Sequence, residues 1–281
     1  MILIADSGST KTQWVVLDPK TKQITKEFTT KGLNPYFWES TAFVTYLQET
    51  LPSVKEVQHL FFYGAGCGLE KQAEWVKTHL SKALEIPHIE VFSDMLGAAR
   101  GLFLDRPGIA CIMGTGTNSC LYDGTQIIKT VPSIGYILGD WGSGAVLGKE
   151  FIGLLLTHQL PRKVEDAFHQ EYHLQKVDIL NNLYRKAYPN RFLASFTHFI
   201  YKHIEVEVIE KMVRENFRLF FSYFVKTYEE TEHSVIFPVH IVGSVAFYFQ
   251  DLLREEGEAM GIDIQRIQVS PMEGLITFHL K

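Results

Sequence analysis

Two glycine-rich turns stand at equivalent points in the two halves of the chain. Residues 6–12 read DSGSTKT and residues 114–119 read GTGTNS, and each turn follows a short apolar run. Glycine lets backbone N–H groups approach phosphate oxygens closely, and the Ser and Thr hydroxyls add further donors. A tight hairpin rich in turn-forming residues is the simpler alternative for either turn alone. Two such turns, both rich in hydroxyl groups, favour the binding of a phosphate chain.

The spacing around these turns excludes the two most familiar nucleotide motifs. A Walker A turn reads GxxxxGK[ST] and precedes a helix, whereas that spacing is absent here and the residues after Lys11 are strand-like. A dinucleotide-binding turn reads GxGxxG and opens a helix, but residues 114–119 lack the third glycine and continue into a strand-like pattern. Each turn is therefore predicted to be the tip of a β-hairpin that cradles phosphate.

Four polar side chains next to predicted strands and turns are candidates for the remaining chemistry. Asp6 ends a buried strand beside the first turn, where phosphate would repel a carboxylate unless a cation such as Mg²⁺ came between them. Asp94 begins a predicted helix, which fits either a helix-capping acid or a general base that accepts a hydroxyl proton. Asn34 and Asp140 fit ordinary turns. From the residues alone, a helix-capping role for Asp94 is favoured over a role as general base.

The apolar pattern predicts an α/β protein in which both halves run three strands, helix, strand, helix. Strands that are apolar on both faces are typical of buried sheet centres. The expected strands are residues 2–5, 13–17, 24–28, 57–63, 89–92, 109–113, 120–122, 127–130, 239–242 and 264–269. Helical periodicity covers residues 35–51, 70–84, 94–103, most of 144–230, and 244–256.

The likeliest boundary between the halves is the turn at residues 105–108, which contains Pro and Gly. We therefore expect an N-terminal domain over residues 1–107 and a C-terminal domain over residues 108–281. The second domain carries a helical insertion at about residues 144–230, and its last segment is expected to be able to pack back on the first domain.

Composition excludes several classes of protein. The chain has 281 residues, 46% hydrophobic and 21% charged, and its 27 basic and 32 acidic residues give a net charge of −5. Nucleic acid and anionic membranes are therefore not expected as partners. Cys67, Cys111 and Cys120 form no CxxC pair, which fits a reducing cytoplasm. The N-terminus lacks the pattern of a signal peptide, and no apolar run approaches the roughly 20 residues of a membrane span.

Six strings in a fixed order connect the chain with a known family. Residues 6–12 (DSGSTKT), 114–119 (GTGTNS) and 242–245 (VGSV) resemble the phosphate-1, phosphate-2 and adenosine motifs of the actin-like ATPase-domain superfamily. Residues 32–38 (GLNPYFW), 93–99 (SDMLGAA) and 135–143 (GYILGDWGS) resemble its BadF/BadG/BcrA/BcrD-type group, which includes N-acetylglucosamine kinases. The likeness spans nearly the whole chain. It implies two ribonuclease H-like domains, each with a mixed βββαβαβα-type core, flanking an ATP cleft.

The resemblance also implies roles for individual residues. It makes Asp94 the catalytic base, in contact with the sugar, and Asp6 the acid on the side of Mg²⁺. The implied sugar ligands are Asn34, Asp94, Thr117, Asn118, Gly135 and Asp140. The implied ATP-binding residues are Ser9, Thr10, Lys11, Gly114, Thr115, Gly116, Gly243 and Ser244.

The resulting expectation is a cytoplasmic kinase that uses ATP and Mg²⁺ to phosphorylate the 6-hydroxyl of an amino sugar. The leading candidate for this sugar is N-acetylglucosamine. Its only expected partner is the small-molecule sugar, with a homodimer left open. The chain departs from the family pattern at Ser133-Ile134-Gly135, where the family often has Gly-Trp-Gly, and at Trp141, where an acid is common. These changes bear on which sugar is bound.

Three alternatives remain beside that expectation. The sugar could instead be glucosamine or N-acetylmuramic acid. The protein could be an ATPase that activates a partner enzyme through an iron–sulfur cluster, although two of its cysteines lie in predicted strands and one in a lone turn. It could also be a catalytically silent sugar sensor, which the presence of Asp6 and Asp94 argues against.

Overall fold

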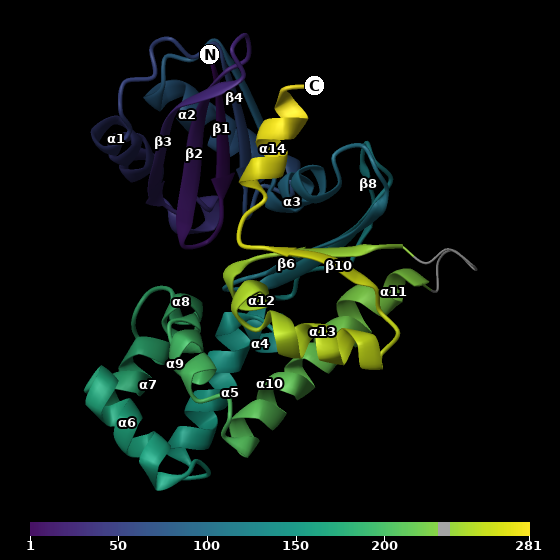
Figure 1. The fold of residues 1–281 in the computed structure, drawn as a ribbon. Coiled ribbons are helices and arrows are strands. Elements are labelled where there is room, and N and C mark those ends of the chain that lie inside the picture. The colour runs from purple at the N-terminus through teal and green to yellow at the C-terminus, as the bar shows by residue number, and fades with distance from the viewer. Residues whose placement is uncertain (230–236) are drawn as a thin grey trace. The chain divides into compact units, whose positions relative to one another are not determined.

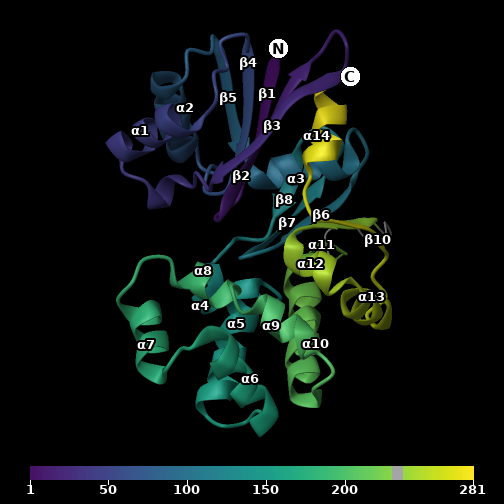
Figure 2. The ribbon, with the colours of Figure 1, turned by 60° about the vertical axis from the view of Figure 1, so that its left-hand side comes forward.

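The computed structural model describes residues 1–229 and 237–281, and the chain divides into two compact units (Figures 1 and 2). The first unit comprises Met1–Ala110, Tyr122–Ile128 and Ser270–Lys281, and the second comprises Cys111–Leu121 and Lys129–Val269. Residue 230, where the predicted helical insertion ends, lies outside the described residues. In the described part of the chain, no helix is long and apolar enough to cross a membrane.

The first unit is built on a five-stranded sheet with the strand order β3-β2-β1-β4-β5. The antiparallel side consists of β1 (Ile2–Ser7), β2 (Lys11–Asp18) and β3 (Gln23–Lys31). Strands β4 (His59–Gly64) and β5 (His88–Ser93) continue the sheet parallel to β1. Because β1, β4 and β5 run in the same direction, their carboxyl ends share one edge, where ligands of α/β sheets commonly bind.

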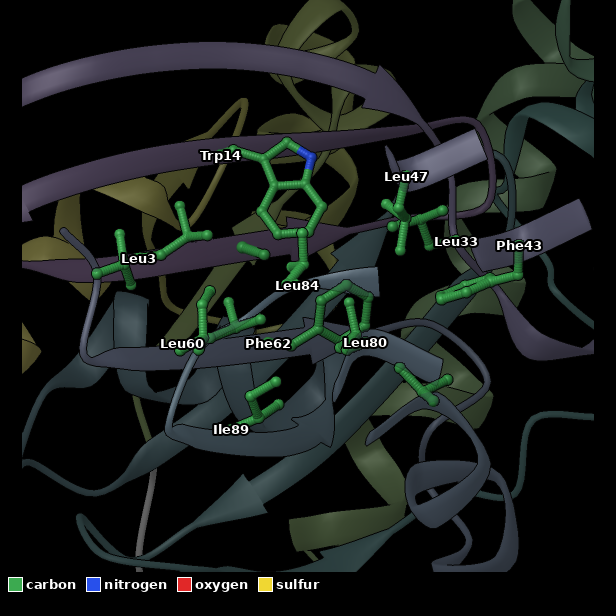
Figure 3. Close-up of a cluster of buried hydrophobic side chains, with 14 of the residues drawn as sticks. Leu3, Trp14, Leu33, Phe43, Leu47, Leu60, Phe62, Leu80, Leu84 and Ile89 are labelled. Atoms are coloured by element: carbon green, nitrogen blue, oxygen red, sulfur yellow. The ribbon is translucent and has the colours of Figure 1, made fainter. Parts of the chain in front are cut away.

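Both faces of this sheet are covered, which explains the uninterrupted apolar run of β1. Side chains alternate between the faces of a strand, so neighbouring residues of β1 and β2 enter different clusters. One cluster lies under α1 (Ser40–Thr50) and α2 (Glu70–Ala83), and Figure 3 shows Trp14 and Phe62 within it. On the other face, Ile4, Val15, Leu17 and Tyr63 pack with Met272 and Leu275 of α14 (Met272–His279).

Helix α14 packs directly against α3 (Asp94–Phe103), the helix that begins with the candidate base (Figure 1). Residues 272–279 carry no helix predicted from the sequence, because eight residues without a clear stop signal give too little periodicity. The contact depends on two glycines, since a Cβ at Gly274 would overlap the backbone carbonyl of Gly101. The last residues of the chain therefore support the element that carries Asp94.

We expect the substitution Gly274→Ala to destabilise the first unit by about 1–3 kcal/mol, the usual cost of overpacking. Chemical denaturation followed by circular dichroism would measure the change. Gly153→Ala is the matched control, because Gly153 lies in α5 (Gly144–Leu156) with open space around the added methyl group. Ala is favoured over Gly in a helix, so this control should be neutral or stabilising. Equal effects of the two variants would contradict the packing argument.

The second sheet has the strand order β10-β9-β6-β7-β8. Its strands are β6 (Gly108–Met113), β7 (Thr117–Tyr122), β8 (Ile127–Thr130), β9 (Val239–Val242) and β10 (Ile264–Gln268), and β9 and β10 are parallel. Between β8 and β9 the described chain is helical. The helices are α4 (Gly135–Leu138), α5, α6 (Arg162–Tyr172), α7 (Lys176–Tyr184), α8 (Pro189–Ala194), α9 (Thr197–Lys202), α10 (Glu207–Phe220), η2 (Phe221–Val225) and α11 (Lys226–Glu229).

The predicted α/β character and the order of the elements are confirmed, and three local predictions are corrected. Strand β7 begins at Thr117, so Thr117 and Asn118 lie on a strand rather than in the second glycine turn. The helix predicted at 244–256 is broken at Phe249 into α12 (Ser244–Tyr248) and α13 (Gln250–Ala259). The helix predicted at 35–51 starts only at Ser40, because a short 3₁₀ turn, η1 (Pro35–Phe37), precedes it.

Candidate functional site

The first glycine turn is the tip of the β1–β2 hairpin, as its spacing predicts. The Gly8 N–H donates to the Lys11 carbonyl at 3.0 Å, and the Gly32 N–H donates to the Thr10 carbonyl at 2.9 Å. A Cβ at Gly32 would lie only 2.6 Å from the Ser9 carbonyl oxygen, so only glycine fits against the turn. The structure thus holds the backbone of this turn rigidly and groups the three predicted ATP-binding residues Ser9, Thr10 and Lys11 at one hairpin tip.

Asp6 and Asp94 lie at the carboxyl edge of the first sheet and influence each other electrostatically. Burial, reinforced by the negative charge of Asp94 and opposed by Lys11, raises the pKa of Asp6 to about 7. Burial also raises the pKa of Asp94 to about 6, although N–H groups at the start of α3 oppose the shift. Two carboxyl groups with raised pKa values at one sheet edge are typical of a functional site.

The structure separates the two roles that the sequence allowed for Asp94. The N-cap of α3 is Ser93, whose side chain accepts from the Leu96 N–H at 3.2 Å. Asp94 follows the cap, and its Oδ1 accepts a hydrogen bond from the adjacent Met95 N–H at 2.9 Å. Capping therefore does not require the Asp94 carboxylate, and its role as a base stays a prediction that this geometry permits.

Asn34 is buried in the first unit, which also contains Asp6 and Asp94, and its side-chain amide has a fixed orientation. Its Oδ1 accepts from the Tyr36 N–H at 3.0 Å, and it caps the 3₁₀ turn η1. Gly66 has a φ of +83°, and a Cβ there would lie 2.6 Å from Asn34 Oδ1. Asn34, a predicted sugar ligand, is therefore a structural cap, and it is held against a glycine whose positive φ and close approach disfavour any side chain.

In the second unit, three backbone segments meet at the second glycine turn. The Gly114 N–H donates to the Gly116 carbonyl at 2.9 Å, and the Gly144 N–H donates to the Gly114 carbonyl at 2.8 Å. Gly243 has a φ of +132°, and a Cβ there would overlap the Met113 carbonyl. The predicted phosphate residues Gly114, Thr115 and Gly116 thus lie next to the predicted adenosine segment, Gly243 and Ser244, although about 130 residues separate the two in sequence.

Two predicted sugar ligands of the second unit carry buried polar atoms without a hydrogen-bond partner in the described structure. These atoms are Thr117 Oγ1 and Asp140 Oδ1. Thr117 adjoins Gly116, and Asp140 Oδ2 lies 3.0 Å from where a Cβ at Gly116 would be, so one hydroxyl group and one carboxyl group flank the same glycine. Burial raises the pKa of Asp140 to about 6. Native proteins rarely leave such atoms unpaired, so an ordered water or a polar ligand is expected as their partner, and their place beside the second glycine turn fits a ligand.

The remaining predicted sugar ligands of the second unit are placed differently. Asn118 is half-buried on β7, and its Oδ1 accepts from the Ser119 N–H at 2.9 Å. Gly135 begins α4 with a φ of +73° and has open space around it. Asp140 itself has a φ of +53°, which Asp and Asn tolerate better than most residues.

A cavity of about 290 Å³ lies in the second unit beside Ser244. It is lined by Thr197, His198, Tyr201, Ser244, Val245, Tyr248 and Phe249, from α9, α12 and the residue after it. Of these residues, only Ser244 is predicted from the sequence to belong to a binding site. Neither helix has a motif of its own, so only the tertiary contact between α9 and α12 reveals the cavity.

Comparison with known proteins decides the family. No family model matches the sequence, and no curated protein matches it. Among solved structures, a putative N-acetylglucosamine kinase from Porphyromonas gingivalis is 43% identical to the chain, with a TM-score of 0.93, and the match covers 100% of this chain and 99% of that one. The chain belongs to the N-acetylglucosamine kinase-like family. The expected enzyme class, an ATP-dependent phosphotransferase with an alcohol acceptor, is thereby confirmed.

Two more distant structures show how widely this fold is shared. A putative N-acetylglucosamine kinase from Chromobacterium violaceum has a TM-score of 0.71 at 15% identity and covers 100% of this chain and 98% of its own. A ROK family glucokinase from Streptomyces griseus, in complex with glucose and AMPPNP, has a TM-score of 0.57 at 15% identity, covering 99% and 97%. These matches confirm the two-domain actin-like ATPase fold.

The described residues of the N-acetylglucosamine kinase-like chain show no ready-made protein cage for a metal ion. In residues 1–229 and 237–281, no group of three or more His, Cys, Asp or Glu side chains is placed to hold one. Mg²⁺ does not require such a cage in kinases, because one or two carboxylates together with substrate phosphates and water complete its coordination. Asp6, at the foot of the first phosphate turn, fits that limited role.

Proposed function

We propose that this enzyme transfers the γ-phosphate of ATP to the 6-hydroxyl of N-acetylglucosamine. The observation that carries the proposal is the pair of unpartnered buried atoms, Thr117 Oγ1 and Asp140 Oδ1, beside the second phosphate turn. A hydroxyl-rich ligand can satisfy both a carboxylate and a hydroxyl group, because each sugar OH donates and accepts. The family relationship to putative N-acetylglucosamine kinases supports the choice of sugar.

In the proposed reaction, the protein mainly positions the reactants and stabilises charge. The backbone of the two glycine turns and the side chains of Ser9, Thr10, Lys11 and Thr115 bind the phosphate chain. Asn34, Thr117, Asn118, Gly135 and Asp140 orient the sugar. Asp94, ionised above its pKa of about 6, accepts the proton of the attacking hydroxyl. Mg²⁺, when bound with ATP near Asp6, neutralises part of the phosphate charge.

The cavity beside Ser244 supports the placement of the nucleotide base in the second unit. Tyr201 and Tyr248 line it, with ring centroids 6.0 Å apart and ring planes tilted by 52°, so a base has no room between them but can stack on the face of one ring. Gly243 joins this cavity to the second phosphate turn through its contact with Met113. The same short segment thus connects the proposed sites for base and phosphate.

The activator alternative receives no support from the cysteines. Cys67, Cys111 and Cys120 are all buried, and burial raises the pKa values of Cys67, to about 12, and of Cys111. An iron–sulfur cluster needs accessible thiolates. These side chains instead behave as small core residues.

A panel of acceptors in an assay coupled to ADP release tests the proposed substrate. The panel contains N-acetylglucosamine, glucosamine, N-acetylmuramic acid and glucose. We expect the highest kcat/KM with N-acetylglucosamine, and ³¹P and ¹³C NMR of the product should place the phosphate on oxygen 6. A higher kcat/KM for another sugar would replace the proposed acceptor, and phosphorylation elsewhere on the ring would refute the 6-hydroxyl assignment.

Asp6→Asn is expected to remove most of the advantage that Mg²⁺ gives to ATP binding. The neutral amide has the same shape as the carboxylate but cannot balance the metal charge. Titration calorimetry with and without EDTA would compare ATP affinity in the wild type and the variant. Asp18→Asn is the control, because Asp18 ends the neighbouring strand β2 away from the turn. An Asp6→Asn protein that keeps the full Mg²⁺ effect would assign the metal role to other groups.

A further inference from the structure

A π-helical turn, η2 (Phe221–Val225), contacts β7, the strand that carries the predicted sugar ligands Thr117 and Asn118. Such turns are rare, and they often occur at functional sites. The Phe224 carbonyl in this turn accepts a hydrogen bond from Ser119 Oγ at 2.7 Å. Ser119 is buried and directly follows the predicted sugar ligands Thr117 and Asn118. The turn is therefore anchored to the strand that presents those ligands.

The same turn also contacts the segment that carries Asp140. The Tyr223 ring stacks on Trp141, the residue after Asp140, with centroids 4.3 Å apart and ring planes 22° apart. Phe224 meets the Trp141 ring nearly edge-on at 6.3 Å. On the side of the preceding loop, the Trp141 ring lies 3.6 Å from where a Cβ at Gly139 would be. Trp141 thus links η2 to the loop at residues 139–143, which contains Asp140.

We propose that Trp141 and Tyr223 are positioning residues for sugar binding. Through this stacked pair, η2 sets the spacing between Thr117 and Asn118 on β7 and Asp140 on the following loop. The proposal rests on the proposed function, because it assumes that these three side chains bind a sugar. Neither aromatic residue needs to touch the sugar.

The backbone around Asp140 shows why such support is needed. Gly139 and Gly142 flank this segment, and Asp140 has a φ of +53°. Two glycines give the loop many alternative conformations, and a buried, unpartnered carboxylate favours those that expose it to water. If the loop adopts its sugar-binding conformation only part of the time, the apparent affinity of the protein for the sugar is reduced in proportion to that fraction. Stacking on Tyr223 raises that fraction before the sugar arrives.

A purely structural role for the pair fits the burial less well. The Tyr223 side chain is 50% exposed, and Trp141 is only half-buried, whereas the core rings Phe217, Phe220 and Phe221 are fully buried. Truncating Tyr223 therefore removes little apolar surface from the core, and the second unit is expected to stay folded. The family pattern often has an acid at position 141, so this stack is particular to chains with an aromatic residue there.

The test compares sugar affinity with ATP affinity in a small set of variants. Tyr223→Ala and Trp141→Leu remove the stack, Tyr223→Phe and Trp141→Phe retain it, and Tyr184→Ala removes an aromatic side chain that is 82% exposed on α7. Titration calorimetry with N-acetylglucosamine and with Mg·ATP measures each affinity, and thermal unfolding checks the fold. The Tyr223→Ala/Trp141→Leu double variant tests whether the two residues act together.

We expect Tyr223→Ala and Trp141→Leu each to weaken N-acetylglucosamine binding by about 2- to 10-fold, the range of a single aromatic pair. ATP affinity should not change, both Phe variants and Tyr184→Ala should bind the sugar like the wild type, and the double variant should lose no more than one single variant. Unchanged sugar affinity in Tyr223→Ala, or an equal loss for sugar and ATP, would overturn the proposal. If the wild type binds none of the amino sugars in the panel, the proposed function itself fails; normal wild-type binding with unaffected variants refutes only the positioning pair.

Discussion

The Asp94→Asn enzyme is expected to turn over about 10²–10⁴-fold more slowly than the wild type, with ATP affinity nearly unchanged. The reason is that the amide has the shape of the carboxylate but cannot accept a proton. The fold should survive, because Ser93 and not Asp94 caps α3. Steady-state kinetics together with calorimetric titration of ATP would separate the two effects.

Asp105→Asn is the matched control for this variant. Asp105 lies just beyond the other end of α3, and its exposed carboxylate pairs with Lys281 at 2.6 Å. This variant should keep wild-type turnover. An Asp94→Asn enzyme that is folded and turns over at a near-normal rate would show that another group accepts the proton.

The same carboxyl group is expected to give the wild type an acid limb in its pH dependence, beside any contribution of Asp6, whose pKa is raised to about 7. The base acts only when it is ionised, and burial raises its pKa from 3.8 to about 6. Activity should therefore fall as the pH drops below about 6, by about tenfold per pH unit well below the pKa. The residual activity of Asp94→Asn should lack this limb if Asp94 alone causes it. A wild-type profile that stays flat down to pH 4.5 would contradict an essential base with this pKa.

Asp140→Asn is expected to weaken N-acetylglucosamine binding by about 10- to 150-fold, because hydrogen bonds to a charged group contribute about 1.5–3 kcal/mol. Asn tolerates the positive φ at this position, so the loop conformation should be retained. Calorimetry with the sugar and with Mg·ATP would show a loss for the sugar alone.

Asp123→Asn provides the comparison, since Asp123 is a turn aspartate outside the sugar segments, and its side chain accepts hydrogen bonds from the N–H groups of residues 125 and 126. Its sugar affinity should equal that of the wild type. If Asp140→Asn binds the sugar normally, the unpartnered Oδ1 has some other explanation and Asp140 is not a sugar ligand.

The family strings supplied the roles predicted for the site residues, whereas the pattern of residues alone did not assign their chemistry. Asp94 illustrates the difference: its position at a helix start was readable from the sequence, yet a capping role and a catalytic role look identical there. In the structure, Ser93 and not Asp94 caps α3, and burial raises the pKa of Asp94 to about 6. A carboxyl group with this pKa is ionised at neutral pH and can accept a proton there.

Local patterns by themselves determined the order of the elements, the two glycine hairpins and the positions of Asp6 and Asp94 at strand and helix ends. This was possible because strand burial and turn chemistry depend on a few consecutive residues. Only the tertiary structure decided that α14 closes against α3 through Gly101 and Gly274, that α9 and α12 enclose a cavity, and that Tyr223 stacks on Trp141. Each of these contacts joins residues distant in the chain, and their packing energy arises only when the fold brings them together.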